Sequence, residues 1–123
     1  MAAKTLLIVD DSRTVRSIVR KMLAETGLEM SEAEDGAQAL DACKASLPDA
    51  VIVDWNMPVL DGIGFVRQLR ALPGGQLPAV IFCTTESSAD HIVTALEAGA
   101  NEYIMKPFDS EIVRLKLEQA GVL

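Results

Sequence analysis

Short apolar runs alternate along the chain with longer segments in which apolar residues recur every three or four positions. Five short runs have the length expected of strands. The third is β-branched and apolar on both faces, as in a strand covered by helices on both sides, and the second is the weakest. The runs are Leu6–Val9, Glu29–Ala33, Ala50–Asp54, Ala79–Thr84 and Glu102–Met105. The pattern therefore predicts five strands.

The segments between these runs predict amphipathic helices, because their apolar residues fall at helical spacing. In the first segment the spacing is carried by Val15, Ile18, Val19, Met22 and Leu23. Capping residues and Gly or Pro mark the expected ends. The expected helices run from Ser12 to Gly27, from Asp35 to Pro48, over Phe65–Leu72, from Ser87 or Ser88 to Gly99, and from Asp109 onward.

Strict alternation of strands and helices with short loops predicts a parallel sheet with right-handed crossovers and helices on both faces. The expected architecture is an α/β sandwich of three layers. A chain of 123 residues with 50% hydrophobic content is long enough for one such domain and too short for two. We therefore expect residues 1–123 to form a single domain that acts through its own surface.

The charge balance narrows the classes of partner. A formal net charge of -7 and a pI near 4.6 disfavour binding to nucleic acid or to an anionic membrane. No stretch approaches the roughly 20 apolar residues of a membrane span, and the N-terminus has no signal-peptide pattern. We expect a cytoplasmic, monomeric protein in which Cys43 and Cys83 are small buried residues.

Chemically distinct residues stand at the ends of four apolar runs. Asp10 and Asp11 follow the first run, Asp54 ends the third, Thr84 ends the fourth and Lys106 follows the fifth. In a parallel sheet these residues meet at the edge where open α/β folds bind ligands. Three neighbouring carboxylates require a counter-ion, and oxygen ligands without His or Cys indicate Mg²⁺. The alternatives are that the acidic pair only caps a helix and that Asp54 only accepts loop amides.

The charges of this group suit phosphoryl transfer. Three carboxylates, Mg²⁺ and Lys106 sum to zero, so an arriving phosphoryl group meets a metal, an ammonium and a hydroxyl group. Asp54 ends the most buried strand, and a rigid carboxylate beside Mg²⁺ can attack phosphorus to form an acyl phosphate. The peptide bond between Lys106 and Pro107 is a candidate for the cis form. A lone Lys after a strand is otherwise a solvated charge.

Together, the motifs at the strand ends resemble the receiver domain of two-component response regulators, and in particular the single-domain chemotaxis regulators of the CheY type. The resemblance covers the chain from Lys4 to about Gly121. Each motif is short, but their order at the ends of successive strands is specific. The motifs are Val9-Asp10-Asp11-Ser12-Arg13, Asp54-Trp55-Asn56-Met57-Pro58 with Asp61-Gly62, Thr84-Thr85-Glu86, and Tyr103 with Lys106-Pro107-Phe108.

The resemblance implies a fold and a reaction. The sheet would have the flavodoxin-like, doubly wound order 2-1-3-4-5. Asp54 would accept a phosphoryl group from a sensor histidine kinase or a small acyl phosphate, with the receiver catalysing its own phosphorylation and dephosphorylation without being an enzyme for other substrates. Asp11, Asp54 and the backbone carbonyl of Asn56 would bind Mg²⁺, and Asp10 would act through water.

The resemblance also implies a switch and an output face. Thr84 and Lys106 would hold the phosphoryl oxygens, and movement of Thr84 would let Tyr103 turn from solvent to the interior. Asn56 and Glu86 would flank the path of water to phosphorus and favour rapid loss of the phosphoryl group. The output patch would contain Ile92, Tyr103, Met105 and Lys116. In the chemotaxis branch, its partner is the flagellar motor switch protein.

Other functions remain as alternatives. A single-domain receiver can instead act as a phosphate shuttle or sink in a phosphorelay. A magnesium-dependent phosphatase of the haloacid-dehalogenase type is disfavoured, because Ser12 and Arg13 replace its nucleophile motif and no residues remain for a cap domain. A flavin carrier lacks support, because no glycine-rich phosphate loop follows the first strand. His91 is expected to be a solvated side chain near the output face.

Overall fold

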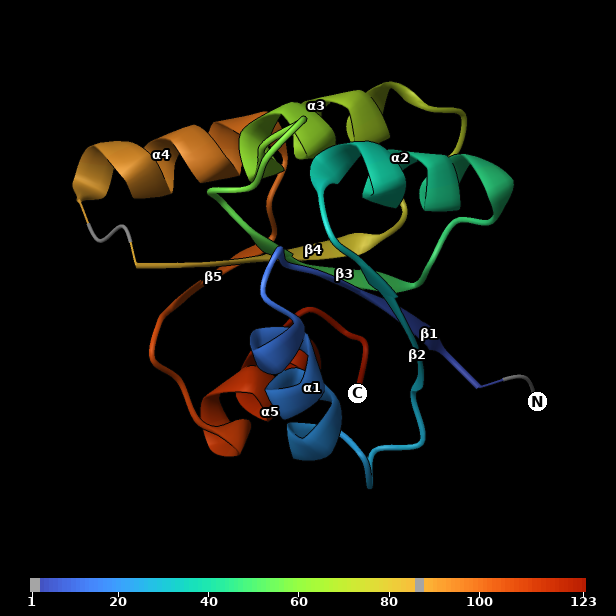
Figure 1. The fold of residues 1–123 in the computed structure, drawn as a ribbon, viewed down its shortest axis with the longest axis vertical. Helices are drawn as coiled ribbons and strands as arrows, with labels where there is room; N and C mark the ends of the chain where they lie inside the picture. The colour runs from blue at the N-terminus through green and yellow to red at the C-terminus, as the bar shows by residue number, and fades with distance from the viewer. Residues whose placement is uncertain (1–2, 86–87) are drawn as a thin grey trace.

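The computed structural model describes residues 3–85 and 88–123, in which five strands and five helices alternate (Figure 1). The strands are β1 (Thr5–Val9), β2 (Glu29–Ala33), β3 (Ala50–Asp54), β4 (Ala79–Thr84) and β5 (Glu102–Met105). The helices are α1 (Arg13–Met22), α2 (Gly36–Ala45), α3 (Gly62–Ala71), α4 (Ala89–Ala98) and α5 (Ser110–Gln119). In these two stretches, no helix has both the length and the apolar character needed to span a membrane.

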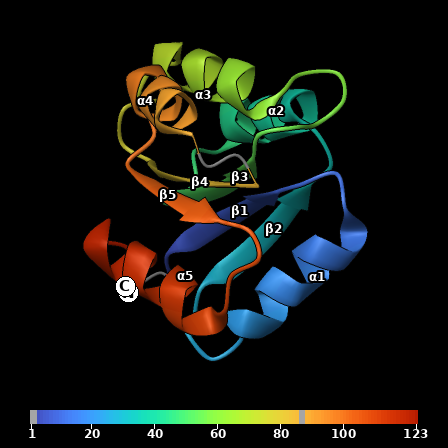
Figure 2. The same ribbon diagram turned by 90° about the vertical axis from the view of Figure 1, so that its left-hand side faces the viewer.

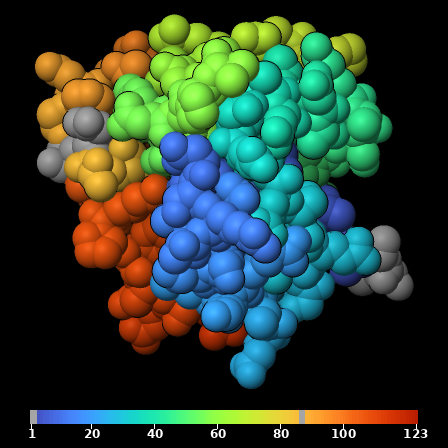
Figure 3. Space-filling model, viewed as in Figure 1, coloured from blue at the N-terminus to red at the C-terminus, as the bar shows by residue number. Residues whose placement is uncertain are grey.

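All five strands are parallel and pair in the order β2-β1-β3-β4-β5. The predicted flavodoxin-like, doubly wound sheet is therefore confirmed. Helices α1 and α5 cover one face, and α2, α3 and α4 cover the other, which gives three layers (Figure 1 and Figure 2). In the space-filling view, the blue surface of α1 and the orange-red surface near α5 lie below the green surface of α3 (Figure 3).

The pleat of the strands builds one apolar core on each face of the sheet. Along β1, Leu7 and Val9 belong to one core, whereas Leu6 and Ile8 belong to the other. The central strand β3 is buried over its whole length, which explains its uninterrupted apolar sequence. The edge strand β2 is largely exposed. Its polar residues therefore face solvent, which is why its signal in the sequence is weak.

The C-terminal ends of the first two helices differ from the prediction. Helix α1 ends at Met22 rather than near Gly27. The Thr26 hydroxyl and backbone N–H both bond the Leu23 carbonyl, so the chain turns away from the helix there. Gly27 then takes a positive φ of 81° in the connection to β2. Helix α2 likewise ends early, at Ala45.

The helices begin at capping residues whose side chains accept a backbone N–H three residues further on. The caps are Ser12, Asp35, Asp61, Ser88 and Asp109. The expected capping residues are thus present, and the alternative cap Ser87 lies outside the described residues. Helix α3 starts directly after Asp61, earlier than its apolar pattern suggested.

Gly62 allows α3 to begin directly against the end of β3. A Cβ atom at this position would lie 2.2 Å from the backbone oxygen of Asp54, which no side chain could tolerate. The Gly62 N–H donates a hydrogen bond to the Trp55 carbonyl at 2.9 Å. The first turn of α3 therefore packs on the backbone that carries the Asp54 side chain.

At the amino ends of the strands, Arg70 connects the end of α3 to the segments that lead into β4 and β5. Its guanidinium donates to the carbonyls of Gly75 and Pro78, both at 2.8 Å. It donates twice to the Gly99 carbonyl, at 3.0 and 2.8 Å, and once to the Asn101 side chain at 3.0 Å. One planar cation thus satisfies acceptors from two connecting segments, the one between α3 and β4 and the one between α4 and β5.

Replacing Arg70 by Met is expected to lower the free energy of unfolding by about 2–4 kcal/mol, because partly buried carbonyls lose a charged donor. The control is Arg67→Met at an exposed position of the same helix, which should change this free energy by less than about 0.5 kcal/mol. Urea unfolding followed by circular dichroism measures both variants. Equal stability of the two would show that Arg70 has no such role.

Candidate functional site

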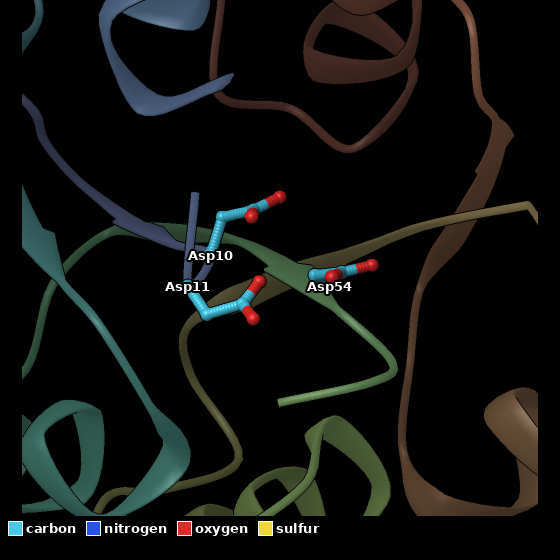
Figure 4. A group of neighbouring side chains, drawn as sticks. All are labelled: Asp10, Asp11 and Asp54. Atoms are coloured by element: carbon cyan, nitrogen blue, oxygen red, sulfur yellow. The ribbon is translucent and has the colours of Figure 1, made fainter. Parts of the chain in front are cut away.

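The carboxyl ends of the strands bring the predicted acidic residues together. Asp10 follows β1 directly, and Asp54 is the last residue of β3, the neighbouring strand. Carboxylate oxygens of Asp10, Asp11 and Asp54 all lie within 4.8 Å of one another. Figure 4 shows the three side chains extending in the same general direction from the ends of their strands. The geometry therefore joins residues that are far apart in the sequence into one acidic cluster.

Lys106 bridges two of these carboxylates. Its Nζ lies 2.8 Å from Oδ2 of Asp10 and 3.3 Å from Oδ1 of Asp54. The backbone N–H of Lys106 donates to the Thr84 carbonyl at 2.8 Å, which holds the ends of β4 and β5 together. The peptide bond between Lys106 and Pro107 is cis, as the sequence suggested. All the charged residues predicted from the strand ends thus share one site.

Burial and pairing shift the ionisation of the two central groups. Burial raises the pKa of the Asp54 carboxyl, and the attraction of Lys106 offsets this only in part. Burial alone would lower the pKa of the Lys106 ammonium, but its hydrogen bond to Asp10 and the charges of Asp10 and Asp54 raise it overall. Lys106 is therefore a permanent cation at neutral pH, whereas the charged form of Asp54 is held at an energetic cost.

The acidic cluster suits a hard divalent cation. Three carboxylates and one ammonium leave a net charge of -2 in the site. The clustered donors are all oxygen atoms, which Mg²⁺ prefers, and Asp11 is exposed, so the cluster is open to solvent on one side. Asn56, whose carbonyl was expected to complete the ligand set, is exposed in the segment that follows β3. The residues present therefore fit the predicted metal.

Four of the predicted switch and output residues lie on β4, β5 and α5, namely Thr84, Tyr103, Met105 and Lys116. The Thr84 side chain is completely buried. Tyr103 is half-buried and packs against the core beneath α3 and α4. A cavity of about 580 Å³ is lined by Tyr103, Met105, Lys116 and neighbours from α5. Ile92 is half-buried on α4 and does not line this cavity, and Glu86 lies outside the described residues.

Two sets of contacts near the site were missed in the sequence, one aromatic and one polar. The Trp55 and His91 rings meet edge to face with centroids 5.0 Å apart, and Trp55 meets Phe82 in the same way at 5.2 Å. His91 is half-buried at the start of α4, so its side chain packs on Trp55 while remaining partly open to solvent. The polar contact is made by Arg16, which is buried and donates a hydrogen bond to the Asp10 carbonyl. Both sets of contacts depend on how the chain packs in three dimensions, which residue spacing along the sequence does not reveal.

The chain is similar to known proteins over almost its whole length. Residues 6–118 match the model of the response regulator receiver domain. Chemotaxis protein CheY1 of Helicobacter pylori (strain J99) is 40% identical over 115 residues, or 92% of this chain and 93% of that protein. The chemotaxis protein CheY homolog of Campylobacter jejuni is also 40% identical, over 92% of this chain and 88% of its own.

Solved structures agree with this similarity. Chemotaxis protein CheY4 of Vibrio cholerae superimposes with a TM-score of 0.91 at 32% identity, covering 97% of this chain and 99% of that one. The receiver domain of a sensor histidine kinase of Pseudomonas aeruginosa superimposes with a TM-score of 0.86 at 30% identity, covering 98% and 99%. That domain holds a magnesium ion coordinated in its active-site cleft.

The raised pKa of Asp54 predicts how the stability of the metal-free protein depends on pH. The folded state binds the Asp54 proton more tightly than the unfolded chain does, so ionisation of Asp54 destabilises the fold once the pH exceeds the raised pKa. Asp54→Asn should therefore raise Tm at pH 7. The gain should disappear as the pH falls below the unfolded pKa of about 3.9, where the carboxyl is protonated in both states.

Calorimetry in the presence of a chelator measures this effect, with about 4 °C in Tm corresponding to 1 kcal/mol for a domain of this size. Asp41→Asn, at an exposed position of α2, is the control and should shift Tm by no more than about 2 °C at any pH. A lower Tm for Asp54→Asn at pH 7 would contradict the predicted cost of the buried charge.

Proposed function

Because the chain belongs to the response regulator receiver domain family, we propose that Asp54 accepts a phosphoryl group and that the phosphorylated protein signals by binding another protein. One observation carries this proposal. Asp10, Asp11, Asp54 and Lys106 lie together at the carboxyl ends of parallel strands, with Lys106 in contact with both buried carboxylates. Membership of the family makes the protein a response regulator of two-component signalling and supports a histidine kinase as the proposed phosphoryl donor.

In the proposed reaction, an Asp54 carboxylate oxygen attacks phosphorus. The new P–O bond forms as the P–N bond of a phosphohistidine breaks, and the histidine nitrogen keeps the electron pair and takes up a proton. When bound, Mg²⁺ supplies positive charge to the carboxylates and to the phosphoryl oxygens. Asp11, Asp54 and the Asn56 carbonyl would hold it, with Asp10 acting through water. Lys106 stabilises the charge that develops on the transferred group.

The pairing of β4 with β5 supports a switch that passes from Thr84 to Tyr103. Thr84 is buried at the end of β4, and Tyr103 lies beside Phe82 of the same strand in the sheet register. A phosphoryl group on Asp54 would draw the Thr84 hydroxyl toward its oxygens. Tyr103 would then turn from its half-buried position into the space behind Thr84. Two positions of one aromatic ring would thus report the state of Asp54 to the surface.

The proposed output face is formed by α4, β5 and α5. Met105 is 38% exposed, and Lys116 forms an ion pair with Glu102 at 3.3 Å beside the cavity that Tyr103 lines. A partner peptide or helix could pack its apolar side chains there. Similarity to chemotaxis proteins supports the flagellar motor switch protein as this partner. We place the protein in the cytoplasm as a monomer.

A second candidate is a phosphate shuttle or sink in a phosphorelay. The observation that favours it is the similarity to the receiver domain of a sensor histidine kinase, at a TM-score of 0.86. A shuttle would use the same Asp54 chemistry but would pass the phosphoryl group to a histidine of another protein. Only the partner distinguishes this function from motor control.

Incubation with acetyl phosphate and Mg²⁺ should add one phosphoryl group to the wild-type protein and none to Asp54→Asn, because only the carboxylate is a nucleophile. Intact-mass spectrometry measures the addition. Asp41→Asn should be phosphorylated like the wild type, because its carboxyl is on the exposed face of α2. Phosphorylation of Asp54→Asn to the wild-type level would place the acceptor elsewhere.

The protein loaded with beryllofluoride and Mg²⁺ should bind the N-terminal segment of the motor switch protein at least about tenfold more tightly than the unloaded protein, a difference of about 1.4 kcal/mol. Met105→Glu should abolish this gain, because it places a charge on the output face. Leu77→Glu, at an 84% exposed position outside that face, should retain it. Fluorescence anisotropy of the labelled segment measures the affinities.

Absence of binding in both states would contradict motor control. Transfer of the phosphoryl group from Asp54 to a histidine phosphotransfer protein would then identify the shuttle.

A further inference from the structure

Arg16 is a buried cation directly beneath the acidic cluster. Its side chain is only 9% exposed, although it belongs to the first half of α1, where the neighbouring Arg13 is exposed. Nη1 donates to the backbone carbonyl of Asp10 at 2.6 Å, and Nε donates to the Glu32 carboxylate on β2 at 2.8 Å. The guanidinium thus joins the end of β1 to the edge strand.

The Asp10 carbonyl needs a donor because it lies beyond the hydrogen-bonded part of the sheet. β1 ends at Val9, the last residue of β1 that pairs with β2 and β3. A buried carbonyl left without a donor costs roughly 1–3 kcal/mol, so a side chain must replace the missing strand partner. Arg16 makes this replacement from the adjacent helix.

The hydrogen bond from Arg16 to the Asp10 carbonyl fixes the peptide unit between Asp10 and Asp11. The Asp10 carbonyl and the Asp11 N–H belong to one rigid plane, so holding the carbonyl restricts the backbone angles on both sides. The other polar groups of Asp10 are held as well. Its N–H donates to the Ala33 carbonyl at 3.2 Å, and its Oδ1 accepts the Ser12 N–H at 2.9 Å. Its Oδ2 contacts Lys106 at 2.8 Å.

Glu32 balances the charge of Arg16. The hydrogen bond from Arg16 lowers the pKa of the Glu32 carboxyl more than any other interaction, and Arg20 adds to this effect. The pair is therefore ionised at neutral pH. The two charges compensate each other, so the pair adds no net positive charge that would repel a cation. Its effect on the acidic cluster is to orient the backbone of Asp10.

We propose that Arg16 is a positioning residue of the cation site. By holding the Asp10 carbonyl, it sets the directions in which Asp10 and Asp11 present their carboxylates to a divalent cation. This inference rests on the proposed function, because the same cation serves phosphorylation of Asp54. Arg16 itself bonds the Asp10 backbone carbonyl and Glu32 rather than a carboxylate of the cluster, so it would act through Asp10.

The test compares Arg16→Met with Arg20→Met. Arg20 also bonds Glu32 and a β2 carbonyl, that of Met30, so its hydrogen bonds go to β2 and not to Asp10. Isothermal titration calorimetry with MgCl₂ is run well below the unfolding transition of each protein. Loss of a residue that orients a metal ligand weakens metal binding by about 10–100-fold, so Arg16→Met should raise Kd by at least about tenfold. Arg20→Met should change Kd by less than about twofold.

A second readout needs no metal. In the chelated protein, exchange of the Ser12 amide hydrogen should be faster in Arg16→Met than in Arg20→Met, because the Asp10 carboxylate that accepts it is no longer held. Should Arg16→Met not fold, Arg16→Lys replaces it. A single ammonium cannot hold both Asp10 and Glu32, so Kd should rise by about threefold.

An unchanged Kd in the folded Arg16 variant, or an equal loss in Arg20→Met, would overturn the role of Arg16. Wild-type Mg²⁺ uptake and phosphorylation of Asp54 would in that case leave the proposed function standing. Absence of Mg²⁺ uptake by the wild-type protein would instead overturn the cation site on which the proposed function depends.

Discussion

Repulsion among three carboxylates at one edge of the sheet is the constraint on which the rest of the structure depends. Asp10, Asp11 and Asp54 are held within a few ångströms, and two of them are buried. Lys106 offsets part of the repulsion through contacts at 2.8 and 3.3 Å. The remaining negative charge is what makes the site receptive to a cation and, through it, to a phosphoryl group. Binding is therefore favoured by an interaction that opposes folding.

The fold withstands this repulsion because the strands that carry the carboxylates are among its most buried elements. β1 and β3 lie side by side near the middle of the sheet, with an apolar core on each face. Gly62 packs α3 on the Asp54 backbone, and Arg16 holds the Asp10 carbonyl. Burial of apolar side chains thus stabilises the fold against the repulsion. A few polar and backbone contacts hold the charged residues in place.

Most of the fold and the centre of the site could be predicted from the sequence, because both follow from periodicity. Apolar runs and helical spacing indicated every strand and helix, and the residues just after the strands indicated the acidic cluster. The order of the strands and the role of Asn56 required the family resemblance. Helix ends such as that of α1 were less predictable, because the side chain of Thr26 decides where the chain turns.

The supporting contacts could not be predicted, because each joins side chains from separate elements. Arg16 stands among other basic residues of α1 and has the same local pattern as exposed Arg13. Arg70 resembles any arginine near a helix end, and nothing links Trp55 to His91 until the first turn of α4 is placed against the segment that follows β3. The packing of His91 on Trp55 was missed for this reason. The periodicity of apolar residues identifies the face of a helix or strand on which a residue lies. Its contact partners depend on which helices and strands pack against each other.

The contacts of Arg70 have a mechanical consequence for α4. This helix is anchored at its C-terminal end, where the Gly99 carbonyl receives two hydrogen bonds from Arg70. Its N-terminal end rests on the site through the rings of His91 and Trp55. A rod fixed at one end and pushed at the other behaves as a lever with its fulcrum at the fixed end. Small displacements beside Asp54 would therefore swing α4 about Gly99, with the largest excursion at its first turn.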